Sequence, residues 1–243
     1  MPLPRLAVRH GGTGAPKAHL APIHVTERYG LVWLCLDEPV AGVPEISQDG
    51  DAAFRRINFD LDVWQTATTR MVDNFLDITH FPYVHRASFG SAAQLEVPHF
   101  ELGDLGDWYG YAYSVTAANP AAGTAASGQT TSTVQRHMSS GFALPFAVRS
   151  TIEYETGLQH ILLLVSTPRD DDSSWFTFVV WRNDDFSVPA DDVTRLDRMI
   201  EAEDKRMLEK VGGTLPLDNV GVVSVQADKA SVEWRRQLRA MLA

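Results

Sequence analysis

Apolar and polar residues alternate along much of the chain with the two-residue period of β-strands. Residues 57–63 alternate strictly, which predicts a strand with one side facing solvent. Other alternating or continuously apolar runs predict further strands at 107–116, 129–137, 150–156, 159–167 and 175–182. The aperiodic segment 117–128, rich in Ala and Gly, is predicted to be a flexible loop.

The period changes to that of a helix on both sides of these strands. An apolar stripe with helical spacing runs from Val193 to Val211 and is followed by Gly212 and Gly213, a typical helix end. A last helix is predicted at 228–242, and a helical segment follows the strand at 57–63. The chain is therefore predicted to be an α+β protein, an antiparallel sheet with flanking helices.

The N-terminal part differs in pattern from the rest. Residues 1–22 show neither the two-residue period of a strand nor the period of a helix. The pattern of residues 23–36 predicts two short strands joined by a turn. A proline-punctuated, acidic stretch follows and has the composition of a linker. We expect a small β-rich region at 1–40, a linker at 41–53 and the main domain at 54–243.

Charge and cysteine content exclude several classes of function. The formal net charge of −10 would repel a phosphate backbone, so nucleic acid is not an expected partner. No apolar run approaches the roughly 20 residues that span a bilayer, and no signal peptide is recognisable, so we expect a cytoplasmic protein without a membrane partner. The single cysteine, Cys35, excludes an internal disulfide, a cysteine-rich zinc site and an iron–sulfur cluster held by this chain alone.

The richest concentration of candidate ligands lies between residues 70 and 88. Asn74, Asp77 and His80 follow one another at intervals of three, so on a helix they would share one face. Pro82 favours a new helix, and the resulting bend would let the imidazole of His85 approach that of His80. Taken alone, such a pair is also compatible with hydrogen-bonded core histidines.

A carboxylate interrupts the apolar stripe of the late helix. Asp204 lies four residues after Ile200 and four before Leu208, in line with the stripe. A carboxylate on a buried face is costly unless it is paired or binds a metal. It is either a salt-bridge partner of an arginine or a third ligand beside two histidines, a set used by non-haem Fe(II) oxygenases and also available to zinc.

The sequence of residues 73–87, DNFLDITHFPYVHRA, resembles the iron-site motif of Rieske non-haem iron oxygenases, in the branch of vanillate O-demethylase and dicamba monooxygenase. Residues 203–205, Glu-Asp-Lys, resemble the acidic motif on the late helix of that family. The resemblance extends over roughly 19–243. It implies a helix-grip (START/Bet v 1-like) catalytic domain in which His80, His85 and Asp204 bind a mononuclear Fe(2+) ion.

The resemblance also assigns roles to two further residues. Asp77 matches the aspartate that joins a ligand histidine to the Rieske histidine of the neighbouring subunit in a ring-shaped homotrimer, although a helix-surface aspartate is the alternative. Asn74 matches a polar residue near the open iron positions, with a structural hydrogen bond as its competing role. The other six histidines match no motif and are interpreted as structural.

The chain departs from the family at its N-terminus. Full-length members bind a [2Fe-2S] cluster through a C-x-H and a C-x-x-H pair, and this sequence contains neither. Residues 18–39 resemble only the last strands of the Rieske domain. We therefore expect an N-terminally truncated oxygenase, produced by a late start, a frameshift or a gene fragment. Its electrons would come from a cluster on another chain and from a ferredoxin or flavin reductase.

Three functions remain open from the sequence. The first is an oxygenase that uses dioxygen to hydroxylate or oxidatively O-demethylate a small aromatic substrate. The second is a catalytically silent helix-grip module that binds a small molecule and keeps a vestigial metal site. The third is a zinc hydrolase with the same three ligands.

Overall fold

The computed structural model describes residues 23–90, 95–218 and 220–243, and the chain divides into two compact units, Met1–Glu45 and Ile46–Ala243. The irregular segment predicted at 1–22 lies outside the described residues. None of the helices in the described parts has the length and apolarity to cross a lipid bilayer.

The first unit contains the predicted hairpin. Strands β1 (His24–Arg28) and β2 (Leu31–Cys35) pair antiparallel. Tyr29 and Gly30 form the two-residue turn with φ values of 64° and 73°, the left-handed conformation that suits the twist of a tight hairpin. The hairpin is confirmed, whereas its origin as the end of a Rieske domain stays a prediction.

The second unit is built on an eight-stranded antiparallel sheet with the order β3-β10-β9-β8-β7-β6-β5, in which β4 also pairs with β10. Its strands are β3 (Arg55–Asn58), β4 (Asp62–Trp64), β5 (Gly103–Asp104), β6 (Tyr109–Ala118), β7 (Thr133–Ala143), β8 (Ala147–Tyr154), β9 (Gln159–Pro168) and β10 (Ser174–Arg182). Long hairpins connect β6 to β10 in sequence order, so neighbours in the chain are neighbours in the sheet.

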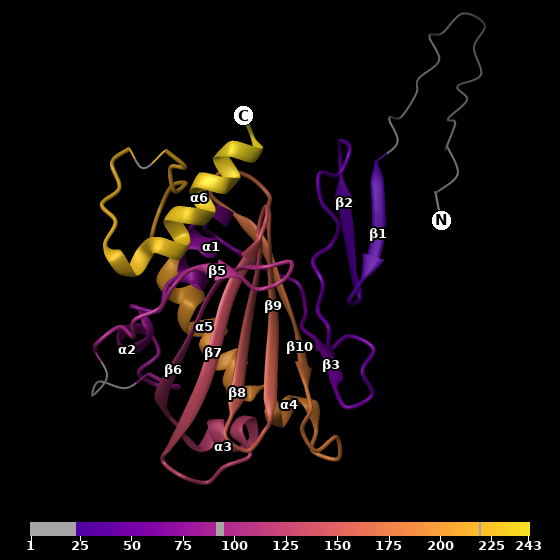
Figure 1. The fold of residues 1–243 in the computed structure, drawn as a ribbon, viewed down its shortest axis with the longest axis vertical. Coiled ribbons are helices and arrows are strands. Elements are labelled where there is room, and N and C mark those ends of the chain that lie inside the picture. Colours follow the sequence, from indigo (N-terminus) through magenta and orange to yellow (C-terminus); the bar gives the residue numbers. More distant parts are fainter. Residues whose placement is uncertain (1–22, 91–94, 219) are drawn as a thin grey trace, which may run out of the picture. The chain divides into compact units, whose positions relative to one another are not determined.

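Helices precede, interrupt and follow the sheet. They are α1 (Thr68–Leu76), α2 (Phe81–Val84), α3 (Ala121–Ser127), α4 (Ala190–Val193), α5 (Arg195–Leu208), the 3-10 turn η1 (Gln226–Asp228) and α6 (Lys229–Met241). In Figure 1, α5 runs lengthwise along the sheet, and α6 lies beside α1. The predicted α+β class is confirmed.

The core lies between this helical layer and one face of the sheet. Leu76 of α1 and Trp234 of α6 pack with Met138 of β7 in one cluster. In a second cluster, Leu208 of α5 packs against Phe176 on β10. Side chains at alternate positions of each strand therefore point toward the helices, and the same alternation decides which of them can reach a site on this face.

Several predicted boundaries were wrong. The strand expected at 57–63 is divided into β3 and β4, and the strand expected at 129–137 lies six residues later at its C-terminal end, as β7. The expected flexible loop contains α3, which begins after Pro120 and ends at Gly128 with a left-handed φ of 66°. Its alanines favour a helix, and proline and glycine at the two ends delimit it.

Candidate metal centre

The first candidate residues lie where α1 ends. The helix stops at Leu76, and Asp77 has an extended conformation (φ −88°, ψ 138°). The expectation that Asn74, Asp77 and His80 share one helix face was therefore wrong. The Asp77 carboxylate accepts hydrogen bonds from the backbone N–H of Thr79 at 2.7 Å and of His80 at 3.2 Å, an arrangement in which a side chain replaces the next helical turn.

That turn fixes the orientation of His80. Its Nδ1 lies 3.2 Å from Oδ2 of Asp77, which also accepts a hydrogen bond from the Thr79 hydroxyl at 2.8 Å. Burial raises the pKa of the Asp77 carboxyl, but the bonds and charge of His80 and the bonds of Thr79 outweigh it and lower the pKa below its usual value. An ionised Asp77 accepts a hydrogen bond from Nδ1–H of His80, so Nε2 of that ring carries the free lone pair.

His85 is oriented in the same way from the other side. It follows the short helix α2, which starts at Phe81 with Pro82 in its first turn, so the predicted new helix at Pro82 is confirmed. Nδ1 of His85 lies 2.8 Å from Oε2 of Glu203, which also accepts a bond of 2.7 Å from the Ser88 hydroxyl. Burial lowers the pKa of His85, but bonds and charges of Asp204 and Glu203 outweigh it and raise the pKa.

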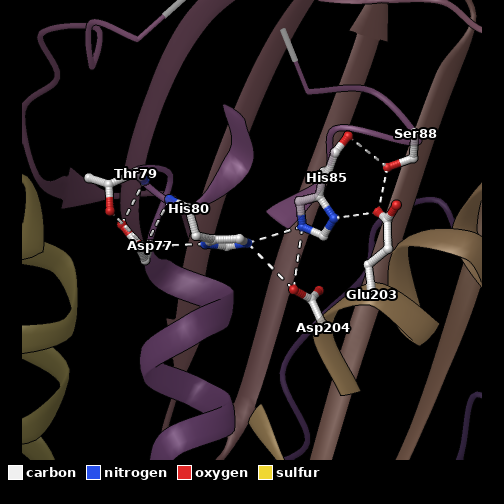
Figure 2. A network of polar contacts seen from close by, with 7 residues as sticks. All are labelled: Asp77, Thr79, His80, His85, Ser88, Glu203 and Asp204. Carbon is white, nitrogen blue, oxygen red and sulfur yellow. Dashed lines mark hydrogen bonds and ion pairs between the residues drawn. The ribbon is translucent and has the colours of Figure 1, made fainter. Parts of the chain in front are cut away.

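The two imidazoles and Asp204 converge on one point. Nε2 of His80 lies 3.1 Å from Nε2 of His85, and Oδ1 of Asp204 lies 3.5 Å from the first and 3.3 Å from the second. Figure 2 shows Asp77 and Glu203 on the outer sides of the two rings and Asp204 facing the gap between them. The structure thus brings together three of the predicted site residues and places Asp77 directly behind one of them.

The spacing of these three atoms suits a metal ion. Ligands about 2.1 Å from one ion are about 3.0 Å apart at right angles and about 3.4 Å apart at the tetrahedral angle. Apart from the two imidazoles, Oδ1 of Asp204 has no hydrogen-bond partner among the described residues, and both facing nitrogens carry lone pairs when each Nδ1 holds the ring proton. Three acceptors without a shared donor repel one another, and a bound cation removes that repulsion. His80, His85 and Asp204 could hold such an ion.

The three residues border a cavity of about 120 Å³ between the sheet and the helices. Its wall is mostly apolar and includes Phe75 and Phe176. Asn74 also lines it, is 7% exposed, and has an amide nitrogen without a hydrogen-bond partner among the described residues. Asn74 is therefore on the cavity side of α1, and its role near the open positions of a metal stays a prediction.

Glu203 is the site residue whose contact the sequence did not predict. Glu203 belongs to the acidic motif and lies next to Asp204 at a gap in the apolar stripe, and in the structure it is 6% exposed and bonds to His85. That gap was the available signal, because two acidic residues interrupted a buried face. Lys205, the last residue of the motif, instead forms an ion pair of 2.6 Å with Asp62 at the start of β4, which ties α5 to the sheet.

A profile of the vanillate O-demethylase oxygenase C-terminal domain matches residues 64–243. The chain belongs to this family. The match covers all three converging residues and both carboxylates behind the imidazoles, and it confirms the resemblance to Rieske non-haem iron oxygenases. The chain covers the C-terminal, catalytic part of these proteins.

The curated relatives that resemble this chain are named as demethylases. The chain is 25% identical over 231 residues to methylxanthine N1-demethylase NdmA of Pseudomonas putida, and the match covers 93% of this chain and 62% of the relative. It is 26% identical over 214 residues to the probable methylxanthine N7-demethylase NdmC of Pseudomonas sp. (strain TJI-51), covering 86% and 74%. The chain thus spans less than two thirds of the length of NdmA.

Solved structures share the fold. Pseudomonas putida CBB5 NdmA with caffeine superposes with a TM-score of 0.79 at 23% identity, over 94% of this chain and 64% of that one. Dicamba monooxygenase bound to 3,6-dichlorosalicylic acid gives a TM-score of 0.77 at 18% identity, over 97% and 74%. The expected fold of an oxygenase catalytic domain, a large antiparallel sheet with flanking helices, is confirmed.

Proposed function

We propose that this chain supplies the catalytic part of an iron-dependent oxygenase that oxidatively removes a methyl group from a small aromatic substrate. The observation that carries the proposal is the convergence of His80, His85 and Asp204 on a single point in the wall of a mostly apolar cavity. Family membership and the demethylases among the relatives support it. They favour demethylation over ring hydroxylation.

The donor set fits Fe(II). Two neutral imidazoles and one carboxylate on one side of the ion, with other positions open, form the set used by non-haem Fe(II) oxygenases. Zinc accepts the same ligands, and the family's use of non-haem iron is what favours iron. When bound, Fe(II) would supply the site at which dioxygen is bound and reduced.

The protein's own contribution is to hold the ligands ready. Asp77 and Glu203 retain the Nδ1 protons of His80 and His85, so that both Nε2 atoms are free. Partners of this kind typically contribute 10- to 100-fold to metal affinity. The apolar wall limits the access of water, and Asn74 offers the cavity an amide donor beside the metal centre.

Each demethylation consumes two electrons. A substrate R–X–CH₃, one O₂, two electrons and two protons give R–XH, formaldehyde and water, where X is oxygen or nitrogen. Cys35 is the only cysteine of the sequence, and one thiolate is too few to hold a [2Fe-2S] cluster. We propose that a Rieske cluster outside these 243 residues supplies the electrons, fed by a ferredoxin or flavin reductase.

Asp77 is the proposed entry point for these electrons. Its side chain is 24% exposed while its Oδ2 contacts the ligand His80, so it reaches from the surface to the centre through one hydrogen bond. In a homotrimer of the family type, this residue would face the Rieske histidine of the next subunit.

Metal analysis tests the centre. The purified chain, reconstituted anaerobically with Fe(II) and desalted, should retain about one iron per chain. His80→Ala, His85→Ala and Asp204→Ala should each retain little, whereas His137→Ala, which removes an exposed histidine bonded to Ser114, should bind iron like the parent. Equal iron in His80→Ala and the parent would contradict the ligand assignment.

Turnover tests the reaction separately. The iron-loaded chain, mixed with a Rieske protein, its reductase and 4-methoxybenzoate, should release formaldehyde in proportion to the electrons consumed. Iron retention without formaldehyde release from any methoxy- or N-methyl-substituted aromatic compound would contradict demethylation and favour a binding module. Stoichiometric zinc retention with ester hydrolysis would favour the hydrolase.

A further inference from the structure

One sulfur atom borders the cavity beside the metal centre. Met138 lies on β7, lines this cavity and is 6% exposed. Of the described residues that form the cavity wall, it is the one that carries sulfur. A thioether is soft and polarisable, and it becomes a sulfoxide by accepting a single oxygen atom. Met138 is therefore the group in the wall that activated oxygen would attack most readily.

The metal centre opens on the same small space. His80, His85 and Asp204 also line the cavity, whose volume of about 120 Å³ is close to that of the ~150 Å³ apolar cavity that holds benzene in an engineered protein. Phe81 packs against the cluster that contains Met138, and its ring centre lies 4.9 Å from that of His80. An empty cavity of this size leaves little distance between the thioether and the open side of the metal centre.

Tyr113 holds the sulfur from the neighbouring strand. It lies opposite Met138 in the register of β6 and β7, and its hydroxyl donates a hydrogen bond of 3.3 Å to Sδ of Met138. Burial raises the pKa of Tyr113 well above its usual value, so the hydroxyl keeps its proton and remains a donor. Thioether sulfur is a weak acceptor, and a sulfoxide makes the side chain polar. The same hydroxyl would therefore bind the oxidised side chain more strongly than the reduced one.

The other methionines of the described chain lie outside the cavity wall. Met71 is fully buried on α1, and three further methionines are partly exposed, namely Met199, Met207 and Met241. None of these four lines the cavity. Oxidants in solution attack methionines in order of exposure, so they would reach the partly exposed three first. An oxidant generated at the metal centre would instead reach Met138 first.

We propose that Met138 is a modification site, to which the metal centre transfers an oxygen atom when it activates dioxygen with no substrate in the cavity. The thioether, one O₂, two electrons and two protons give methionine sulfoxide and water. A lone pair of the sulfur forms the new S–O bond, the O–O bond breaks, and the second oxygen leaves as water with both protons. The electrons are those that demethylation would consume, so this inference rests on the proposed function.

Hydrogen peroxide tests the transfer without any electron donor, because it already carries both electrons: thioether and peroxide give sulfoxide and water. Trypsin cleaves after Arg136 and Arg149 and releases 137–149, a peptide with Met138 as its only methionine. In the iron-loaded chain treated with equimolar peroxide, this peptide should gain one oxygen, about 16 Da, before the peptides of the other methionines do. In the iron-free chain the order should reverse, with the partly exposed methionines oxidised before Met138.

Three controls separate directed from random oxidation. Met138→Leu should retain as much iron as the parent and gain no oxygen in 137–149. His80→Ala, given the same Fe(II) and peroxide, should show the order of the iron-free chain, because iron outside the centre does not direct the oxidant to the cavity. Met71, which is more deeply buried than Met138 but lies outside the cavity wall, should stay reduced throughout.

The order of oxidation decides the proposal. An order that iron does not change would overturn it, and so would oxidation of Trp64, which also lines the cavity, in place of Met138. A mass gain in 137–149 that methionine sulfoxide reductases do not reverse would count against it equally, because that oxygen would lie on Phe142 or Phe146 rather than on sulfur.

Formaldehyde release separates this site from the proposed function. Iron-directed oxidation of Met138 without formaldehyde from any methoxy- or N-methyl-substituted aromatic compound would retain the site and contradict demethylation. Formaldehyde release by an iron-loaded chain whose Met138 stays reduced under peroxide would retain demethylation and contradict the site.

Discussion

At the scale of single residues, α5 places its carboxylates in quite different environments. Asp197 lies against His160, Glu203 bonds to His85, and Oδ1 of Asp204 faces Nε2 of both His80 and His85. The apolar stripe identified Asp204 because four-residue spacing places a side chain in line with its neighbours. The stripe could not predict the contact of Glu203 with His85. Glu203 lies one position away from the stripe, and the direction of its side chain depends on the residues packed around it.

Glu201, on the same helix, should make stability depend on pH. It lines the cavity, and burial, together with the charge of Asp62, raises its pKa from 4.5 to about 7. The native state therefore favours the protonated carboxyl, and the stability contributed by that proton is lost as the pH rises through about 7. Glu201→Gln, which cannot ionise, should unfold at a higher denaturant concentration than the parent at pH 8 and at a similar one at pH 5.

Urea unfolding of the metal-free protein at both values measures this difference. Glu155→Gln, in the exposed turn before β9, controls for the loss of one carboxylate. Its difference from the parent in urea midpoint should be the same at pH 5 and pH 8. A difference between Glu201→Gln and the parent that is the same at pH 5 and pH 8 would mean that the carboxyl is not perturbed by its burial.

At the scale of elements, the sequence predicted the start or end of a helix better where the backbone conformation of one residue alone determines it. Pro82 marked the start of α2 because proline fits a first helical turn. The end of α1 was missed, because nothing in the periodicity of 70–81 distinguishes a continuing helix from a turn closed by Asp77. Whether the helix ends there depends on the hydrogen bonds that Asp77 makes with His80. The spacing of apolar residues along the chain carries no information about those bonds.

The short segment after α2 should tolerate no side chain at Gly90. A Cβ there would lie 2.3 Å from the carbonyl oxygen of Phe81 and 2.9 Å from that of His85. The Gly90 N–H also donates a bond of 2.8 Å to the His85 carbonyl. Gly90→Ala should therefore displace the backbone that carries His85, lower the free energy of unfolding by about 1–3 kcal/mol and weaken Fe(II) retention.

Gly103→Ala is the comparison for that variant. Gly103 lies in β5 with nothing within 4 Å of its added Cβ, so the same substitution should leave both the urea midpoint and the iron content close to those of the parent. If Gly90→Ala matched Gly103→Ala in both measurements, the close backbone packing behind His85 would not constrain the centre.

At the scale of the whole molecule, the centre joins parts of the chain that are distant in sequence. His80 and His85 follow α1, and Asp204 lies on α5, after the entire sheet. The sequence predicted the convergence of His80, His85 and Asp204 because each lies in a short motif or a regular stripe. It did not predict the cavity, because the cavity wall is formed by side chains on separate strands and helices that meet only after the sheet and helices have packed.

Such a centre should couple metal binding to the stability of the whole domain. The three ligands converge only in the folded chain, so an ion that binds them stabilises the native state, by about 2.7 kcal/mol at a hundredfold excess over Kd. For a domain of this size that corresponds to an increase in Tm of about 5–10 °C. Anaerobic Fe(II) should produce this increase in the parent, and a chelator should reverse it.

The increase in Tm on adding Fe(II) should be larger at pH 8 than at pH 6, because protons compete for the imidazoles. Asp204→Ala should fold and melt without a response to Fe(II). A similar increase in that variant would place the ion elsewhere on the protein.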